Sequence, residues 1–230
     1  MIPKKIHLIY FSDENDSQMP NLYQFCYNEI IDIYNDYDVK LYNRQDCLNL
    51  ITEYYPEYIN AYNSFEYDIQ KIDFMKLLLV YHYGGFYMDL DMMPILSLDD
   101  LLEHDLVVCE EFTINNEEKE RLNLKYNVRV ANFMFGAIDH NLFLLDALTT
   151  DQERSSIKIS SKQELLDLTG PGLFTDTLFD NFETYNNVRF LTKKLNRGFG
   201  AYAEHLSSKQ WEKNTDIDKL LNIYNTINVN

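Results

Sequence analysis

The order of hydrophobic and polar residues predicts that strands and helices alternate from the start of the chain. The apolar run in KKIHLIYF is typical of a buried strand that begins near Lys5. Helical spacing of apolar residues follows at 21–34, a strand-like alternation at 38–43, and a second helical pattern at 45–54. This β-α-β-α rhythm favours an α/β fold with a mostly parallel central sheet.

The strongest helical pattern spans residues 68–83. The segment DIQKIDFMKLLLVYHY contains no glycine or proline and is densely apolar, so we expect a helix that is buried on nearly all sides. Gly84 and Gly85 follow it, as is typical of a helix C-terminus. The segment GFYMDL then predicts a central strand.

Shorter patterns complete the predicted fold. We expect further strands at 105–110, 128–138 and 188–192. We expect further helices at 141–148, at 172–182 and after residue 215. No repeat or linker separates these elements, so we expect a single domain over residues 1–230. Six of the seven glycines form three close pairs, which mark turns or a close approach of backbone to a ligand: Gly84–Gly85, Gly170–Gly172 and Gly198–Gly200.

Charge and cysteine content exclude several classes of function. The formal net charge is −17 and no basic patch is present, so we expect no nucleic-acid partner. The three cysteines, Cys26, Cys47 and Cys109, lack the spacing of a zinc site and indicate reduced thiols in a cytosolic protein. No apolar run approaches the roughly 20 residues of a transmembrane segment. The acidic segment at 110–121 predicts a solvated loop or helix face.

Two carboxylates at the end of the predicted central strand are the first candidate for chemistry. The chain contains three D-x-D triplets, at Asp36/Asp38, Asp89/Asp91 and Asp216/Asp218. A turn explains the first triplet and a helix cap the third, but Asp89 and Asp91 follow a buried strand and point to one side of it. Buried carboxylates are costly unless a cation neutralises them, and Mg²⁺ and Mn²⁺ prefer oxygen ligands. The carboxyl end of such a strand is also where α/β sheets bind ligands.

The preceding helix offers a second polar pair. Asp73 and Lys76 lie three residues apart and therefore share one face of the helix. A surface ion pair would explain them on an ordinary helix. Because this helix is apolar nearly all round, we interpret the pair as the wall of a polar site that continues into Asp89 and Asp91.

These residues together resemble a known family. The stretch KIDFMKLLLVYHYGGFYMDLDMMPI resembles the DXD-containing sugar transferases of glycosyltransferase family 32, whose members read D-x-x-R and Y-G-G-x-Y-x-D-x-D. That family includes bacterial capsule and lipooligosaccharide transferases and the yeast initiating mannosyltransferase, and the clostridial glucosylating toxin domains are more distant relatives. Four weaker segments agree in order: IPKKIHLIYF, ANFMFGAIDHNLFL, TGPG and YAEHLSSKQW.

The resemblance implies a GT-A fold, which is a Rossmann-like domain that binds a nucleotide-sugar and a Mn²⁺ or Mg²⁺ ion. It implies that Asp91 is the direct metal ligand and that Asp89 contacts the ribose or the metal shell. It places Tyr87 against the nucleoside, and Asp73 and Lys76 against hydroxyls of the donor sugar.

The resemblance also implies a wider donor site. The remaining residues expected there are Ile9 and Tyr10 at the base edge, Asn132 near the sugar or the acceptor, Gly85 and Gly170 beside the donor, and His205 and Trp211 in a segment that closes over the diphosphate. Two departures bear on specificity. Lys76 stands where the family usually has arginine, and a lysine point charge does not replace the planar guanidinium fork. Gln210 replaces the closing serine, which leaves the residue that completes the metal shell open.

The expected function is therefore metal-dependent, retaining transfer of a sugar from a nucleotide-sugar to a glycan or polysaccharide hydroxyl. UDP is the favoured nucleotide because most bacterial relatives use it, and GDP stays open. We expect a cytoplasmic bacterial enzyme, and peripheral association with the inner membrane face also stays open. We favour front-face substitution, because Asp73 is the sole candidate for a carboxylate nucleophile beneath the anomeric carbon.

Three other functions compete with this interpretation. Haloacid-dehalogenase-like phosphohydrolases also place D-x-D after a buried strand, but Met93 occupies their threonine or valine position, and at least two β-α units precede the motif here. A degenerate sugar-nucleotide binder would explain the Lys76 and Gln210 departures, although the intact aspartates argue against it. A protein-modifying toxin would need more chain than 230 residues provide.

Overall fold

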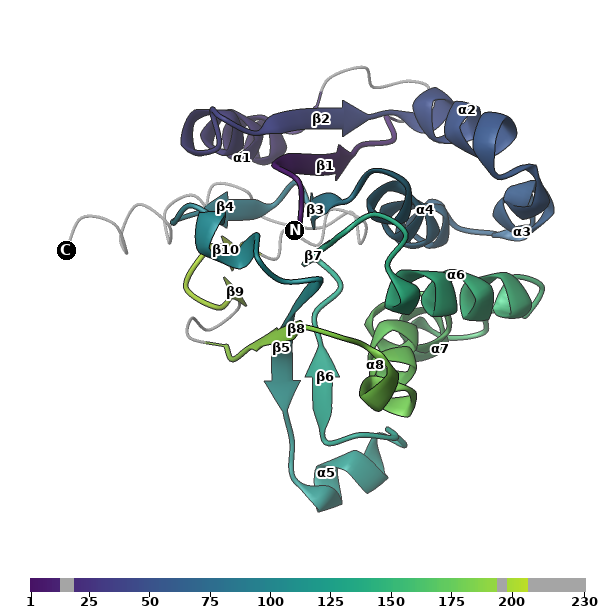
Figure 1. Ribbon diagram of the computed structural model, residues 1–230. Helices are drawn as coiled ribbons and strands as arrows, with labels where there is room; N and C mark the ends of the chain where they lie inside the picture. Colours follow the sequence, from purple (N-terminus) through teal and green to yellow (C-terminus); the bar gives the residue numbers. More distant parts are fainter. Residues whose placement is uncertain (13–18, 194–197, 207–230) are drawn as a thin grey trace.

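The computed structural model describes residues 1–12, 19–193 and 198–206, and its elements follow the predicted alternation (Figure 1). The strands are β1 Lys5–Ile9, β2 Asp38–Tyr42, β3 Gly85–Met88, β4 Met92–Pro94, β5 Leu106–Thr113, β6 Val128–Val130, β7 Met134–Ala137, β8 Val188–Leu191, β9 Gly198–Phe199 and β10 Ala203–His205. The α-helices are α1 Asn21–Ile33, α2 Arg44–Tyr54, α3 Ile59–Ser64, α4 Asp68–Tyr83, α5 Asn116–Arg121, α6 Leu142–Arg154, α7 Lys162–Leu168 and α8 Pro171–Asp180. Short 3-10 helices lie at Pro56–Tyr58, Asp99–Leu101 and Phe182–Thr184.

Seven of the described strands form the central sheet, in the order β2-β1-β3-β7-β5-β6 with β8 also paired to β5. The β1–β2, β1–β3 and β5–β8 pairs are parallel, and the β3–β7, β5–β7 and β5–β6 pairs are antiparallel. Five strands (β1, β2, β3, β5 and β8) therefore run in one direction, and β6 and β7 run against them. The predicted α/β fold with a mostly parallel sheet is confirmed.

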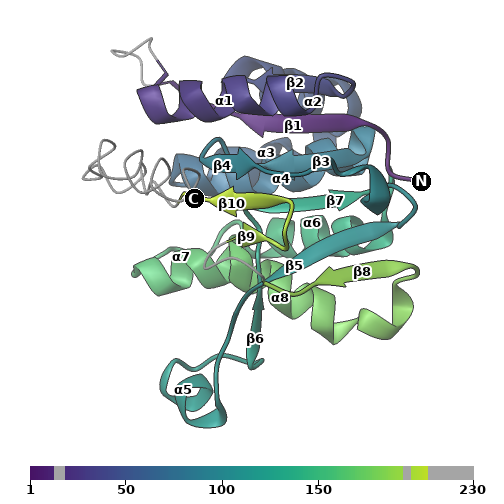
Figure 2. The same ribbon diagram turned by 90° about the vertical axis from the view of Figure 1, so that its left-hand side faces the viewer.

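Each face of the sheet packs against a different set of elements. Helices α2, α3, α4, α6 and α8 share one hydrophobic core with the sheet, while α1 and the segment that includes β9 and β10 contribute to the other core (Figures 1 and 2). Strand β3 is buried on both sides, with Tyr87 in the first core and Phe86 and Met88 in the second. Its alternation therefore directs the side chain of every second residue toward α4.

Helix α4 is buried along most of its length, as its pattern predicts. Every residue from Asp73 to Val80 is buried, polar and apolar alike. The helix ends at Gly84, which has a φ of +62°. Gly85 then begins β3 with a φ of +107°, and a Cβ at this position would lie 2.6 Å from the carbonyl oxygen of Lys5. The glycine pair thus lets β3 approach β1 closely, immediately after the helix.

The structure corrects three of the predicted elements. The segment 128–138 forms two strands, because the chain breaks between Val130 and Met134. Strand β5 continues to Thr113, so that β5, α5 and β6 form an arm that projects from the rest of the fold (Figure 2). A second sheet, in the order β4-β10-β9, was not predicted. The helix expected after residue 215 lies outside the described residues.

Candidate active site

The end of β3 carries two carboxylates into a sharp turn. Tyr87 and Asp89 lie two residues apart, so their side chains leave the chain on the same side. The Asp89 N–H donates to the carbonyl of Phe133 (2.8 Å), and the Met92 N–H donates to the carbonyl of Asp89 (3.1 Å). These bonds fix the turn between β3 and β4, and they hold Asp91, which is 7% exposed, at the edge of the sheet.

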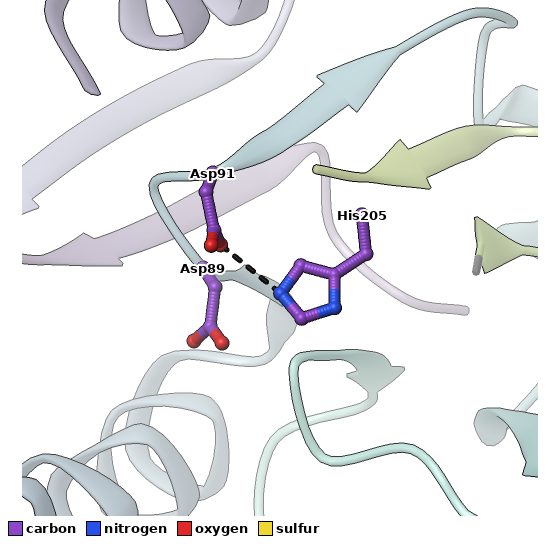
Figure 3. Close-up of side chains that lie close together, drawn as sticks. All are labelled: Asp89, Asp91 and His205. Atoms are coloured by element: carbon purple, nitrogen blue, oxygen red, sulfur yellow. Dashed lines mark ion pairs between the residues drawn. The ribbon is translucent and has the colours of Figure 1, made fainter. Parts of the chain in front are cut away.

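His205 reaches this turn from the far end of the chain. Strand β10 pairs antiparallel with β4 and sets His205 opposite Met92. The imidazole stacks on Phe133 with ring centroids 4.3 Å apart, and its Nε2 lies 3.2 Å from Oδ1 of Asp91 (Figure 3). Asp89, Asp91 and His205 each offer one ligand atom, and these atoms all lie within 4.8 Å of one another.

The charges of this cluster favour a positive partner. Burial raises the pKa of Asp89 to about 6; the nearby Lys76 opposes this rise and the Asp91 carboxylate adds to it. Burial alone would lower the pKa of His205, but the Asp91 and Asp89 carboxylates raise it above its ordinary value. Carboxylate oxygens suit Mg²⁺ and Mn²⁺, and an imidazole nitrogen is a ligand that transition metals accept. The three side chains therefore fit a divalent cation.

A second polar group lies on α4. Lys76 Nζ lies 2.5 Å from Oδ1 of Asp73, and the two residues are only 3% and 5% exposed. The Asn132 amide also donates to Oδ1 of Asp73 (3.1 Å), and the Thr169 hydroxyl donates to Oδ2 (3.5 Å). Burial opposes the charge on Lys76, but the Asp73 and Asp89 carboxylates outweigh it and raise the pKa of the lysine. The pair is therefore a buried ion pair with two further donors on the carboxylate.

Tyr87 joins the two polar groups. Its hydroxyl donates to Oδ1 of Asp89 (2.6 Å), and Lys76 Nζ lies 5.3 Å from the centroid of its ring. The ring also packs against Phe135 in the core, which leaves the residue 1% exposed. Tyr87 thus contacts a carboxylate of the cluster through its hydroxyl, and the expected contact of its ring with a nucleoside stays a prediction.

The other predicted residues divide into four groups. Asn132 and Gly170 lie beside Asp73; a Cβ on Gly170 would be 3.5 Å from Oδ2 of Asp73. Ile9 ends β1, and the Tyr10 N–H that follows it donates to the carbonyl of Tyr42. Gly85 lies at the opposite end of β3 from Asp89, so the structure does not bring it to the cluster. Trp211 lies outside the described residues, as does Gln210.

Two residues of the site had no individual role in the prediction from sequence. Thr169 belongs to the TGPG turn, where only the glycine was singled out, and its hydroxyl completes the contacts of Asp73. Phe133 belongs to the ANFMFG segment and supplies both the carbonyl that holds Asp89 and the ring under His205. The turn motif and the segment resemblance were the signals that could have found them.

Comparison with known proteins agrees with this geometry. Residues 20–108 match the family described as a glycosyltransferase sugar-binding region containing a DXD motif, and the match includes α4, β3 and both aspartates. This segment, which is less than half of the chain, is similar to a DXD-containing glycosyltransferase sugar-binding region. His205 and the Asn132 and Thr169 donors lie outside the matched segment, so the structure adds them to the sugar-binding region.

Several curated relatives of the chain are fungal proteins whose names describe mannosyl transfer to inositol phosphoceramide. The chain is 25% identical to mannosyl phosphorylinositol ceramide synthase CSH1 of Saccharomyces cerevisiae over 82% of its own length and 45% of that protein. It is 31% identical to inositol phosphoceramide mannosyltransferase 3 of Schizosaccharomyces pombe over 45% of its own length and 28% of that protein. The chain thus spans less than half the length of these relatives.

Solved structures show the same fold. The PaToxG glycosyltransferase matches 79% of this chain and 70% of its own, with a TM-score of 0.59 and 14% identity. The UDP-bound glycosyltransferase domain from the YGT toxin matches 88% and 80%, with a TM-score of 0.54 and 9% identity. The predicted glycosyltransferase GT-A fold is confirmed.

None of the helices in the described part of the chain has the length and hydropathy needed to span a membrane.

Proposed function

We propose that this protein is a metal-dependent, retaining glycosyltransferase that moves a hexose from a nucleotide-sugar to a hydroxyl group of a glycan. The observation that supports this most is the cluster of the buried Asp91 with the partly exposed Asp89 and His205, and its two aspartates form the motif of the sugar-binding region. The position of the cluster, at the carboxyl end of a parallel strand, is where α/β sheets bind ligands.

The metal in this proposal is Mn²⁺, with Mg²⁺ as the alternative. Asp91 and Asp89 would hold it, as expected from sequence, and His205 is the third ligand that the geometry adds. The imidazole nitrogen favours a transition metal over Mg²⁺, which prefers an all-oxygen shell. A divalent cation in this position would neutralise the charge that develops on the leaving diphosphate.

The chain's own groups would bind and orient the donor sugar. The Asp73–Lys76 pair presents a carboxylate and an ammonium group next to the cluster, and both can bond to sugar hydroxyls. Tyr87 would hold Asp89 in its orientation through the 2.6 Å hydrogen bond. Each of these groups is buried, so bonds made to a substrate there would form largely away from water.

For the transfer itself, we propose front-face substitution. The bond from the anomeric carbon to the diphosphate oxygen breaks, the acceptor oxygen bonds to the same face, and the departing phosphate oxygen takes the acceptor proton. A covalent intermediate would need a carboxylate free to attack the anomeric carbon. Asp73, the candidate for that role, already contacts Lys76, Asn132 and Thr169. An inverted product or a trapped glycosyl-enzyme would contradict this mechanism.

Donor hydrolysis tests the function directly. The protein is incubated with UDP-glucose, UDP-galactose, their N-acetyl forms and GDP-mannose, with Mn²⁺ or with EDTA, and released nucleotide is measured. We favour a UDP-sugar, and GDP-mannose belongs in the panel because the fungal relatives are named as mannosyltransferases. Release from one donor that EDTA abolishes would support the proposal. Phosphate release from simple phosphomonoesters, with every nucleotide-sugar intact, would replace it with a phosphohydrolase.

The acceptor is a second stage of the same test. The fungal relatives' names give an inositol phosphoceramide acceptor. The family that the sequence resembles also includes bacterial capsule and lipooligosaccharide transferases, and this resemblance favours a polysaccharide. We propose a glycan hydroxyl and would compare soluble oligosaccharides with inositol phosphoceramide as acceptors of the radiolabelled sugar. Nucleotide binding with neither hydrolysis nor transfer would point instead to a degenerate binder.

A further inference from the structure

Asp151 is a buried carboxyl group without a visible function. It lies in the last turn of α6, with an exposed fraction of 0%. Among the residues that the structure describes, neither of its side-chain oxygens has a hydrogen-bond partner. A buried polar group in this condition costs free energy of folding, and an apolar residue of similar size would be more stable there. The fold therefore tolerates an unfavourable side chain at this position.

The surroundings of Asp151 connect it to the sugar-binding region. Helix α6 packs against α4 within one core, with Leu144 and Leu148 on one side and Phe74 and Leu78 on the other. The charges of Asp73 and Lys76 both act on the Asp151 carboxyl, and its own charge acts in turn on Lys76. Burial, with Asp73 adding to it, raises the pKa of Asp151 well above its ordinary value. Asp151 is therefore a buried carboxyl group without a hydrogen-bond partner among the described residues, on a helix that packs against the helix of the ion pair.

The arrangement around Lys76 shows what such a group could do. In the described structure Asp73 is its ion-pair partner, but the proposed function requires Asp73 to bond to donor-sugar hydroxyls. When the donor binds, the ion pair between Lys76 and Asp73 would then weaken. Asp151 is the buried carboxyl on the neighbouring helix whose hydrogen-bonding capacity is unused.

We propose that Asp151 is a positioning residue of the donor site, which gains its hydrogen-bond partner in the Asp73–Lys76 pair when the donor sugar binds and holds that pair in place. This inference rests on the proposed function, because the donor sugar is what would draw Asp73 away. It adds α6 to the elements that shape the site. It also explains why an acid rather than a leucine at this position would be useful.

Three variants test the inference in the full chain. Asp151→Leu removes the polar group at similar volume, and Asp151→Asn keeps a donor and an acceptor. Leu148→Met, one turn earlier on the same buried face, is the matched control. Thermal unfolding is measured without donor, and kcat and KM are measured with whichever nucleotide-sugar of the panel the wild type hydrolyses. Mn²⁺ affinity is measured separately, since Asp151 is not a proposed ligand.

We expect Asp151→Leu to unfold at a higher temperature than the wild type, yet to lose about tenfold in kcat/KM through a higher donor KM. Asp151→Asn should stay within about threefold of wild type, and Leu148→Met should match it. Mn²⁺ affinity should be unchanged in all three. An Asp151→Leu protein that is more stable and has wild-type kcat and KM would contradict the inference while leaving the proposed function intact.

A double-mutant cycle in stability decides the matter even if the wild type hydrolyses none of the donors. The unfolding free energies of Asp151→Leu, Lys76→Met and the double variant are compared with that of the wild type. The cycle is measured with and without the panel of nucleotide-sugars, and coupling between the two positions is expected only with a donor present, because neither Asp151 oxygen has a hydrogen-bond partner among the described residues without one. Strictly additive effects would overturn the inference, whereas an inactive wild type with clear coupling would overturn only the proposed function.

Discussion

Strand β3 has a histidine near each end, a buried one at its start and a partly exposed one at its end, and the two differ in their partners. At the start of β3 lies His7, which belongs to the neighbouring strand β1. Its Nε2 is 2.8 Å from the carbonyl oxygen of Gly84, and its Nδ1 is 3.1 Å from the Tyr42 hydroxyl. At the end of β3, His205 lies 3.2 Å from the Asp91 carboxylate. Burial lowers the pKa of His7 to about 4, whereas the carboxylates raise the pKa of His205 despite its burial.

The difference separates a structural histidine from a functional one. The neutral His7 ring donates from Nε2–H to Gly84 and accepts from Tyr42, so both nitrogens are satisfied and none is left for a ligand. His205 faces two carboxylates that need a positive partner, and a proton or a metal ion can supply it. His7 is 2% exposed and the His205 side chain 19%, and the neighbouring groups decide the role of each.

The largest effect is expected for Asp91. Asp91→Asn removes the charge of a proposed metal ligand while keeping its shape, so metal-dependent donor hydrolysis should fall about a thousandfold in kcat/KM, or about 4 kcal/mol. The matched control is Asp38→Asn, in an exposed D-x-D triplet of β2, which should keep full turnover. Full turnover in Asp91→Asn would show that the cluster is not the metal site.

The pH dependence of stability should come next and should identify His7. Its folded-state pKa, about 4, lies below the ordinary value of 6.5, so the unfolded state binds the proton first as pH falls. His7 therefore stabilises the fold above pH 6.5 and loses about 3 kcal/mol of that stabilisation between pH 6.5 and 4. The Asp89 carboxyl, with its pKa raised to about 6, acts in the opposite direction over the same range, so wild type alone would not isolate the effect.

His7→Gln provides the comparison, because an amide can donate to Gly84 and does not titrate. At pH 7 the variant should be about 1–2 kcal/mol less stable than wild type, since it loses ring packing and one hydrogen bond. At pH 4 the order should reverse, as only the wild type has lost the contribution of His7. Urea unfolding at both pH values measures this, and a constant difference would mean that folding leaves the pKa of His7 unchanged.

The sequence predicted one of these histidines better than the other, and the reason is distance along the chain. His7 lies inside the apolar run KKIHLIYF, whose pattern predicts a buried strand, and Asp89 and Asp91 followed from the strand that precedes them. The partnership of His205 with Asp91 depends on β4, β9 and β10, which have only two or three residues each. Strands this short carry no readable periodicity, and pairing between distant segments leaves no local signal.

The same reason applies elsewhere in the site. The Asp73–Lys76 pair was predicted as a polar wall from the apolar helix around it, but its Asn132 and Thr169 donors come from two other parts of the chain. The break that separates β6 from β7 was missed because its residues, Ala131 to Phe133, are as apolar as the strands around them, apart from Asn132. Its place was set by the tertiary bonds of Asn132 and Phe133.

Replacing each histidine with glutamine in turn is a more specific test, with a smaller expected effect. His205→Gln should lower donor turnover by roughly 30-fold, or about 2 kcal/mol, because the amide is a poorer ligand for the metal. Its stability without metal should change little. His7→Gln should show the reverse, with reduced stability and wild-type turnover per folded molecule. Equal losses of turnover in both variants would remove the distinction between the two ends of β3.

The smallest effect is the stabilisation that the metal itself provides. Mn²⁺ at ten times its dissociation constant should stabilise a protein that binds it only when folded by about 1.4 kcal/mol, which corresponds to a rise of roughly 4 °C in the unfolding temperature. His7→Gln should retain this rise, since His7 lies at the other end of β3, and His205→Gln should lose most of it at the same Mn²⁺ concentration. Thermal scans with Mn²⁺ and with EDTA need no substrate, so they test the three-ligand site independently of donor identity. A full Mn²⁺ shift in His205→Gln would reduce the site to the two aspartates and would leave His205 as an ion-pair partner of Asp91.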